Sequence, residues 1–323
     1  GRMSERAVDY QAADIARLVP DGSTVALTGA GIFLEPDEIL AALEKSFLET
    51  GHPRDLTVVH ALGIGDGKAS GMARFAHDGM TRRVIGGHWS WSPAMQAMAR
   101  ENRVEAYSFP AGAISSLLRE IGAGRPGLTT RIGLGTFADP AVDGGRCNEA
   151  AKDNLVERVD VDGETYLRYK PLKIDVGIVR GSEVDPRGNI GFVREPADLD
   201  ACAVALAAHN SGGVVLAQVE CRRENPILPA RLARMPGILV DAVLVAPHAR
   251  KTYLPDYDPH LSGELHADPQ AAVQPMEQPV GIRRIIAERA MQEIDGARSV
   301  NFGYGIPGGI PALLQKAGKT DYW

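Results

Sequence analysis

Hydrophobic positions in the first part of the chain alternate between two spacings, and this alternation predicts the fold class. Short apolar runs such as 23–28 and 56–59 have the length of buried strands, and each ends in a glycine-rich loop. Between them, from about Pro36, apolar residues recur every three or four positions, which is typical of a helix with one buried face. Strands that alternate with helices in this way predict an open, largely parallel α/β sheet with flanking helices.

Two further strands are expected at 82–85 and 104–108, with helices at 92–101 and through Ile114–Ile121. Ligands of such sheets bind at the carboxyl ends of the strands, and the glycine loops of this chain follow strands. Loops of this kind expose backbone N–H groups that can hold an anion or a developing oxyanion. The loops after the first two strands contain Gly29, Gly31, Gly63 and Gly65.

The pattern changes in the second half of the chain. A hairpin is expected around Asp162–Gly163, followed by strands at 175–180 and 214–219 and a helix near 198–208. Residues 222–280 are rich in proline and poor in periodicity, which predicts an ordered linker, although 238–245 can form one or two strands.

After this linker, a helix is expected over 281–294. The segment 298–307 then resembles the first strand and glycine loop of the chain, and the match is either coincidental or the start of a second α/β domain. The second reading gives three parts: a first domain at 4–221, a linker at 222–280, and the incomplete start of a similar domain at 281–323.

Composition and charge exclude several classes of function. The 323 residues carry a formal net charge of −6 and contain no run of Lys and Arg, so a nucleic-acid partner is not expected. The three cysteines form no CxxC pair and the histidines show no ligand spacing, so no metal site is predicted. The sequence has no apolar run long enough to span a bilayer and no secretory signal, which predicts a cytoplasmic protein without a membrane partner.

Two glycine motifs are poor matches to known nucleotide-binding loops. Residues 133–138 fit GxGxxA, but they run into Asp139–Pro140 instead of a helix that could hold a dinucleotide phosphate. Gly318–Thr320 imitates the end of a P-loop, yet position 313 is Leu instead of the required glycine. His88, next to Trp89, is either a site residue or a packed or capping histidine.

The order of short motifs along the chain resembles family I coenzyme A transferases, most closely the propionate CoA-transferase branch, in which both halves are fused. The motifs that carry this resemblance are 43–51, 74–79, 87–89, 98–102, 105–107, 133–140, 210–213, 218–220, 257–259 and 261–264, and 301–307 matches the opening of the family's second domain.

The resemblance implies transfer of CoA from an acyl-CoA to a free carboxylate by ping-pong catalysis through a glutamyl-CoA thioester. It places the glutamate nucleophile beyond Trp323, because Glu288 and Glu293 fall on the preceding helix. No residue of this chain is therefore expected to be catalytic, and the chain alone is expected to be inactive. CoA is a substrate here, so no cofactor is expected.

The implied partners are an acyl-CoA, a carboxylic acid, the remainder of the C-terminal domain and further copies in a homo-oligomer. The implied setting is short-chain fatty acid or ketone body metabolism.

One position departs from the family pattern. Family members usually have Gln before the Gly that opens the helix after the strand at 105–108, where this chain has Ala111 before Gly112. Loss of the amide opens space, so we expect an acyl group that is bulkier than acetate or propionate, or differently oriented. The residues expected to line the substrate pocket are Gly29, Gly31, Gly63, Gly65, His88, Ala111, Gly112, Gly135, Asn301, Gly303 and Gly305.

Two other functions remain open at this point. The chain could be a non-catalytic module that binds CoA or a phosphorylated metabolite, because related α/β folds sense effectors. It could also belong to an acyl-CoA hydrolase, in which water accepts the acyl group from the same kind of intermediate.

Overall fold

The computed structural model describes residues 8–224, 227–251, 257–260, 262–266, 268 and 275–319. Contacts divide the chain into two units, residues 1–265 and 266–323, and each is described by itself. Positions 4–7, Leu261 and Trp323, which entered the expectations above, lie outside the described residues.

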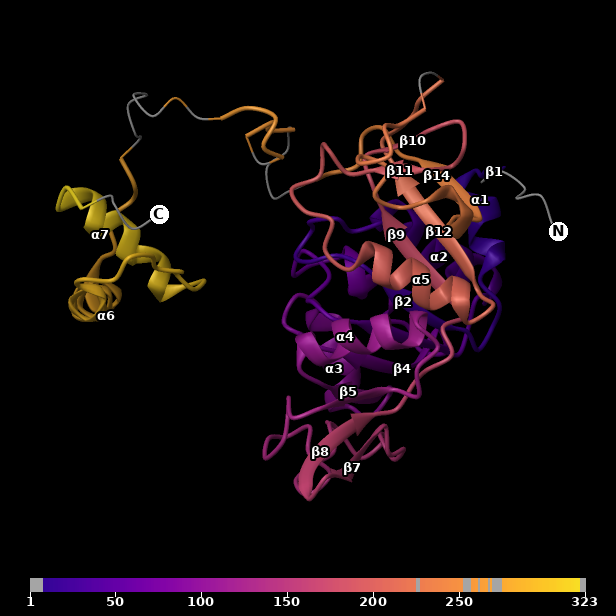
Figure 1. Ribbon diagram of the computed structural model, residues 1–323, viewed down its shortest axis with the longest axis horizontal. Coiled ribbons are helices and arrows are strands. Elements are labelled where there is room, and N and C mark those ends of the chain that lie inside the picture. Colours follow the sequence, from indigo (N-terminus) through magenta and orange to yellow (C-terminus); the bar gives the residue numbers. More distant parts are fainter. Residues whose placement is uncertain are drawn as a thin grey trace. The chain divides into compact units, whose positions relative to one another are not determined.

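The first unit is built on an eight-stranded sheet in which every neighbouring pair is parallel (Figure 1). This confirms the expected α/β class. In spatial order the strands are β1 (Val8–Asp9), β14 (Ala242–Val245), β12 (Val214–Val219), β9 (Val176–Arg180), β2 (Thr24–Leu27), β3 (Leu56–His60), β4 (Thr81–Gly86) and β5 (Glu105–Ser108).

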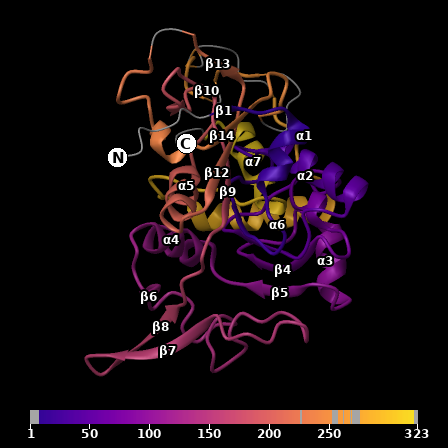
Figure 2. The same cartoon turned by 90° about the vertical axis from the view of Figure 1, so that its right-hand side faces the viewer.

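Helices cover both faces of this sheet, which is why its strands are apolar on both sides. One core contains the inner faces of α4 (Ala111–Gly122) and α5 (Ala201–Asn210). The other core contains residues of α1 (Ala12–Ile15), α2 (Asp37–Thr50) and α3 (Pro93–Arg100). Figure 2 shows the strands between these two helical layers.

Strand order reverses direction in the middle of the sheet. From β2 the chain builds outward through β3 and β4 to β5, and it later returns to place β9 on the other side of β2. Loops on either side of such a reversal diverge, so the carboxyl ends of β2 and β9 are where an open α/β sheet binds ligands.

Between β5 and β9 the chain forms a small antiparallel sheet of β6 (Leu128–Thr130), β8 (Glu164–Tyr169) and β7 (Val156–Val161). Its β7–β8 pair is the hairpin expected around Asp162–Gly163. A third sheet contains β11 (Ile190–Gly191), β10 (Glu183–Val184) and β13 (Cys221–Arg222). The short 3-10 helices of this unit are Ala16–Leu18, Gly71–Phe75 and Gly237–Leu239.

Part of the segment that was expected to be a linker belongs to the main sheet. Strand β14 lies within 222–280 and pairs with both β1 and β12. The strand expected in 238–245 begins only at Ala242, because Gly237–Leu239 forms a 3-10 turn first. The boundary between the two contact units lies at 265–266, within this segment.

The second unit contains α6 (Gly281–Met291), a 3-10 turn at Gln292–Ile294, another at Ile306–Gly309, and α7 (Ile310–Lys316). Ala287, Ile310, Leu313 and Leu314 form its core. Residues 298–305 form no strand, although their sequence resembles the first strand and loop of the chain. A strand needs a neighbour to accept and donate its hydrogen bonds, and the described part of this unit offers none. No helix in the described parts of either unit is long and apolar enough to cross a membrane.

Candidate active site

Four loops at the carboxyl ends of β2, β3, β4 and β5 bring together most of the residues expected to form the site. The N–H of Gly31 donates to the carbonyl oxygen of Gly63 at 2.7 Å. His88 packs directly on Gly63, so that a β-carbon there would lie only 2.3 Å from His88 Nδ1. The next contact joins Gly87 to Ala111, where a β-carbon on Gly87 would lie 3.0 Å from the Cα of Ala111. The loops therefore form a continuous row along this edge of the sheet.

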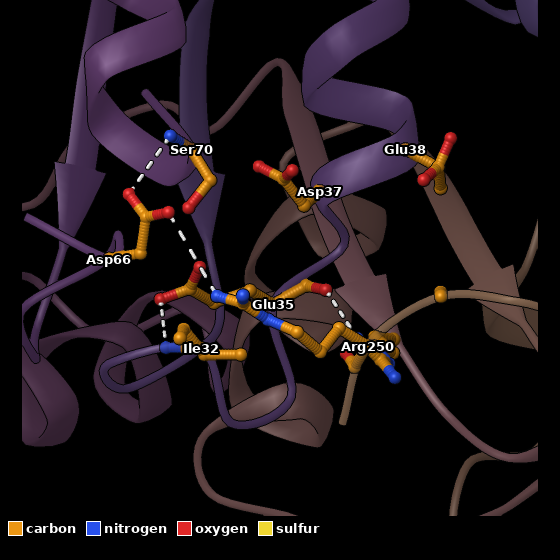
Figure 3. A pocket seen from close by; sticks show the side chains of 9 residues that line it. Ile32, Glu35, Asp37, Glu38, Asp66, Ser70 and Arg250 are labelled. Carbon is orange, nitrogen blue, oxygen red and sulfur yellow. Dashed lines mark hydrogen bonds and ion pairs between the residues drawn. The ribbon is translucent and has the colours of Figure 1, made fainter. Parts of the chain in front are cut away.

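Glu35 holds the first two of these loops together. Its Oε1 accepts the N–H of Ile32 at 2.7 Å and the N–H of Gly65 at 2.7 Å, and Figure 3 shows the bond to Ile32. The residue is only 2% exposed. Sequence reasoning missed Glu35, because a glutamate just before a helix gives no signal that it is buried.

These bonds change what the glycine loops can offer to a ligand. The N–H groups of Gly31 and Gly65 are both used within the chain, by Gly63 and by Glu35. Donation from these two groups to a bound anion would require breaking an internal hydrogen bond. At these positions glycine serves the close approach of the loops and, at Gly65, a φ of 131°.

The carboxyl group of Glu35 binds its proton more tightly than an ordinary glutamate does. Burial raises the pKa of Glu35 from 4.5 to about 7, against the opposing effect of the N–H groups of Ile32 and Gly65. The nearby Asp37 raises the pKa further, and Arg180 lowers it. Glu35 is therefore partly protonated at neutral pH, in contrast to an ordinary surface glutamate.

A cavity of about 230 Å³ lies beside Glu35. Asp66 on its rim accepts the N–H groups of Lys68, Ala69 and Ser70, and it lies 3.9 Å from Arg250 Nη2. Partial burial alone would raise the pKa of Asp66, but these hydrogen bonds lower it below its usual range. The lining residues are Ile32, Glu35, Asp37, Glu38, Asp66, Ser70, Arg180, Ala249 and Arg250 (Figure 3).

A buried ion network fixes one side of this cavity. Arg180, at the end of β9, donates through Nη1 to the carbonyl oxygens of Glu35 at 3.0 Å and Arg250 at 2.8 Å. Its Nε donates to Glu195 Oε1 at 3.3 Å, and Lys251 Nζ donates to the same oxygen at 3.0 Å. One guanidinium thus joins the segments that follow β2, β9 and β14.

The other end of the row contains the N-terminus of α4. The first N–H groups of a helix have no acceptor within the helix, so those of Ala111 and Gly112 are oriented to donate outward. A β-carbon at Gly112 would meet nothing within 4 Å, which means that open space adjoins this helix end. His88 is exposed beside it, and its Nε2 lies 3.0 Å from the hydroxyl of Ser90.

His60, at the end of β3, binds the loop that carries His88 and was also missed by sequence reasoning. Burial lowers the pKa of His60 to about 4, so the ring is neutral at physiological pH. Its Nδ1 lies 2.7 Å from the carbonyl oxygen of Leu62, and its own carbonyl oxygen accepts the N–H of Gly87. The ring is therefore neutral, and the backbone of His60 holds the loop that carries His88.

Of the other expected residues in the first unit, Gly29 belongs to the loop after β2, whereas Gly135 lies in a separate loop. Gly135 donates to Asp139 Oδ2 at 2.8 Å in the loop after β6, and Arg158 holds that carboxylate and keeps its pKa well below the usual range. Gly29 packs against the side chain of Glu35. Asn301, Gly303 and Gly305 are exposed residues of the second unit, and their place in the site stays a prediction. Within the described ranges no three His, Cys, Asp or Glu side chains group to hold a metal ion.

A model of the family described as "Coenzyme A transferase" matches residues 8–246. The chain belongs to this family. It is 38% identical over 313 residues to a caffeate CoA-transferase of Acetobacterium woodii, an alignment that covers 96% of this chain and 59% of the relative. It is 32% identical over 322 residues to the acetate CoA-transferase YdiF of Escherichia coli K12, covering 99% of this chain and 60% of YdiF.

The structure agrees with these sequence matches. An acyl-CoA transferase (YdiF) from E. coli O157:H7, solved as a thioester complex with CoA, superposes with a TM-score of 0.90 at 32% identity. The match covers 98% of this chain and 60% of that one. The chain thus spans about 60% of the length of YdiF, and the family resemblance of its sequence is confirmed.

Proposed function

We propose that the whole protein transfers CoA from an acyl-CoA to a free carboxylate through a glutamyl-CoA thioester. The observation that carries this proposal is the row of loops that joins Gly31, Gly63, His88 and Ala111 at the carboxyl edge of the sheet, in a chain of this family. The glutamate nucleophile is placed beyond Trp323, so residues 1–323 by themselves are expected to be inactive.

The proposed chemistry needs a donor for a developing oxyanion. A glutamate oxygen attacks the thioester carbonyl carbon, the C–S bond breaks, and the CoA thiolate then attacks the resulting anhydride at the glutamyl carbon to release the acyl carboxylate. An acceptor carboxylate reverses these steps. The N–H groups of Ala111 and Gly112 have no acceptor within α4, so we place the substrate carbonyl or carboxylate at this helix end.

We further propose that the acyl group is larger than acetate or propionate. The open space beside Gly112 and the short side chain of Ala111 support this substrate choice. Because a relative 38% identical is named a caffeate CoA-transferase, aromatic propenoic acids are included among the candidates.

Substitution of Ala111 by Gln tests the substrate proposal. The longer amide would fill the space beside the α4 N-terminus, so we expect A111Q to lower kcat/KM for the best bulky acid by about tenfold or more. The loss for acetate should be smaller. A selectivity profile that already peaks at acetate, or A111Q raising activity on the best acid, would contradict this choice.

The oligomer, the cellular location and the domain scheme are part of the same proposal. We propose a cytoplasmic homo-oligomer that acts in short-chain fatty acid or ketone body metabolism. In it, residues 4–221 together with β14 form the N-terminal domain, the rest of 222–280 forms the connection, and 281–323 begin the C-terminal domain.

A CoA-exchange assay tests the main proposal. The complete product of the gene and the 1–323 chain would be offered acetyl-CoA with short, branched and aromatic acids, and new acyl-CoA species would be detected by mass. We expect exchange by the complete protein and none by 1–323. Free CoA without a new acyl-CoA would instead indicate a hydrolase, and a folded protein without either product would indicate a binding module.

A further inference from the structure

Hydrogen bonds hold both the side chain and the backbone of Glu35. Its carboxyl oxygen Oε1 accepts the N–H groups of Ile32 and Gly65, and its backbone carbonyl oxygen accepts Arg180 Nη1 at 3.0 Å. Gly29 packs against the side chain so closely that a β-carbon there would lie 2.6 Å from Glu35 Cγ. These contacts leave the carboxyl group little freedom to move.

Oε1 of Glu35 connects the loop after β2 with the loop after β3, and the position of His88 depends on the second of these loops. Ile32 belongs to the loop after β2, and Gly65 belongs to the loop after β3, which also contains Gly63. The bond from Gly31 N–H to Gly63 O ties the same two loops together. Because His88 packs on Gly63, a shift of the second loop would move the imidazole as well.

The burial of Glu35 indicates that its carboxyl group does more than fill space in the core. Glu35 is only 2% exposed, and burial of a carboxyl group costs free energy that burial of an apolar side chain does not. The same side chain lines the 230 Å³ cavity. The gain is one oxygen that satisfies two backbone donors from two different loops.

We infer that Glu35 is a positioning residue for the proposed CoA transfer, since its Oε1 fixes the loop after β3 on the loop after β2 and so places Gly63 and His88 beside the α4 N-terminus. The inference rests on the proposed function. It requires an acceptor oxygen at this point and does not require a negative charge. Glutamine can supply that oxygen, whereas alanine cannot.

The experiment compares E35Q, E35A and the matched control E49Q in the complete protein. Glu49 lies at the other end of α2, is 59% exposed and pairs with Lys45 on the same helix, away from the cavity. Rates of CoA exchange would be measured well below the unfolding midpoint of every variant, so that loss of folded protein does not contribute. Protection of the Ile32 and Gly65 amides from hydrogen exchange would be measured in parallel.

We expect E35A to lower kcat by about ten- to a hundredfold, with a smaller change in the KM for acyl-CoA, because the reacting groups are misplaced. Amide protection at Ile32 and Gly65 should be lost in E35A only. E35Q should restore both the rate and the protection, and E49Q should match the wild type.

An active wild type with an equally active E35A would overturn this inference alone. E35Q as impaired as E35A would also overturn it, because the oxygen acceptor would then be insufficient. If the wild type itself exchanges no CoA, the proposed function fails, and the catalytic part of this inference fails with it.

Discussion

At single positions of the candidate site, the neighbouring atoms decide whether a side chain larger than glycine fits. Gly63 is buried, and two aromatic rings approach the place where a β-carbon would be, with His88 Nδ1 and Trp91 Cδ1 both 2.3 Å away. Gly112 has open space instead. The same residue type therefore fulfils different needs along the row, a close approach in one loop and access to a helix end in another.

Substitution of Gly63 by alanine should displace the ring of His88. We expect G63A to lower the free energy of unfolding by about 1–3 kcal/mol, as overpacking does, and to lower CoA-exchange kcat/KM by about tenfold or more. Gly308 is a matched control for stability, because a β-carbon there meets nothing within 4 Å. Wild-type stability and activity in G63A would show that the His88 ring is free to move aside.

The proton on Glu35 should make stability depend on pH. Because the folded-state pKa is about 7 and the ordinary value is 4.5, the folded protein binds the proton more tightly than the unfolded chain between these values. Stability should therefore fall as pH rises from about 4.5 to 7. Urea unfolding at pH 5 and pH 8 would measure this loss.

The variant E35Q removes the titrating group from that measurement. Between pH 5 and pH 8, E35Q should lose less unfolding free energy than the wild type does, and E49Q should lose as much as the wild type. An unchanged difference in E35Q would mean that Glu35 is ionised throughout this range.

At the level of elements, contacts between distant segments decide how the helices and loops are held. Helix α2 begins after Pro36, which supplies no side-chain cap. The amide oxygen of Gln218, from the end of β12, accepts the N–H of Glu38 at 2.9 Å in its place. Arg180 similarly joins the segments after β2 and β14.

Removal of the Arg180 guanidinium should destabilise this arrangement of loops. Its side chain and that of Glu195 are 4% and 0% exposed, so R180M would leave a buried carboxylate with Lys251 as its remaining cation. We expect a loss of about 3–5 kcal/mol in unfolding free energy. Arg17, 78% exposed and paired with Asp14, is the control, and R17M should cost less than about 1 kcal/mol.

Chemical denaturation at one pH would compare the two variants with the wild type. Equal small losses in R180M and R17M would mean that Lys251 alone is sufficient to balance the Glu195 carboxylate, and that the guanidinium does not hold the loops.

At the level of the whole molecule, the hydrophobic cores are confined to one unit or the other. Two large clusters, one on each face of the sheet, lie within residues 1–265, whereas the core of the second unit contains four buried residues among those that the structure describes. A core of that size is too small to stabilise an independent domain.

A chain that ends after Leu265 should therefore fold and unfold like the first unit of the longer chain. We expect its midpoint of thermal unfolding to lie within about 2 °C of that of residues 1–323. A peptide of residues 266–323 should show no cooperative transition. Circular dichroism would measure both, and a large drop in the midpoint on truncation would contradict the separation of the cores.

The sequence alone determined most strands and helices of the main sheet, its parallel character and the family. Strands such as 175–180 and helices such as the one after Pro36 were predictable within a few residues, because their apolar spacing is local. It was also predictable that residues after the strands would meet at one edge, since the carboxyl ends of parallel strands share that edge. The row of Gly31, Gly63, His88 and Ala111 is an example.

The tertiary structure decided which groups in that row are available to a ligand. The N–H groups of Gly31 and Gly65 bond to Gly63 and Glu35, and the buried Glu35 and His60 have altered pKa values. Residues 298–305 remain without strand partners, and β14 enters the main sheet. Each of these outcomes depends on burial or on hydrogen bonds between distant segments, and neither is encoded in the spacing of residues along the chain.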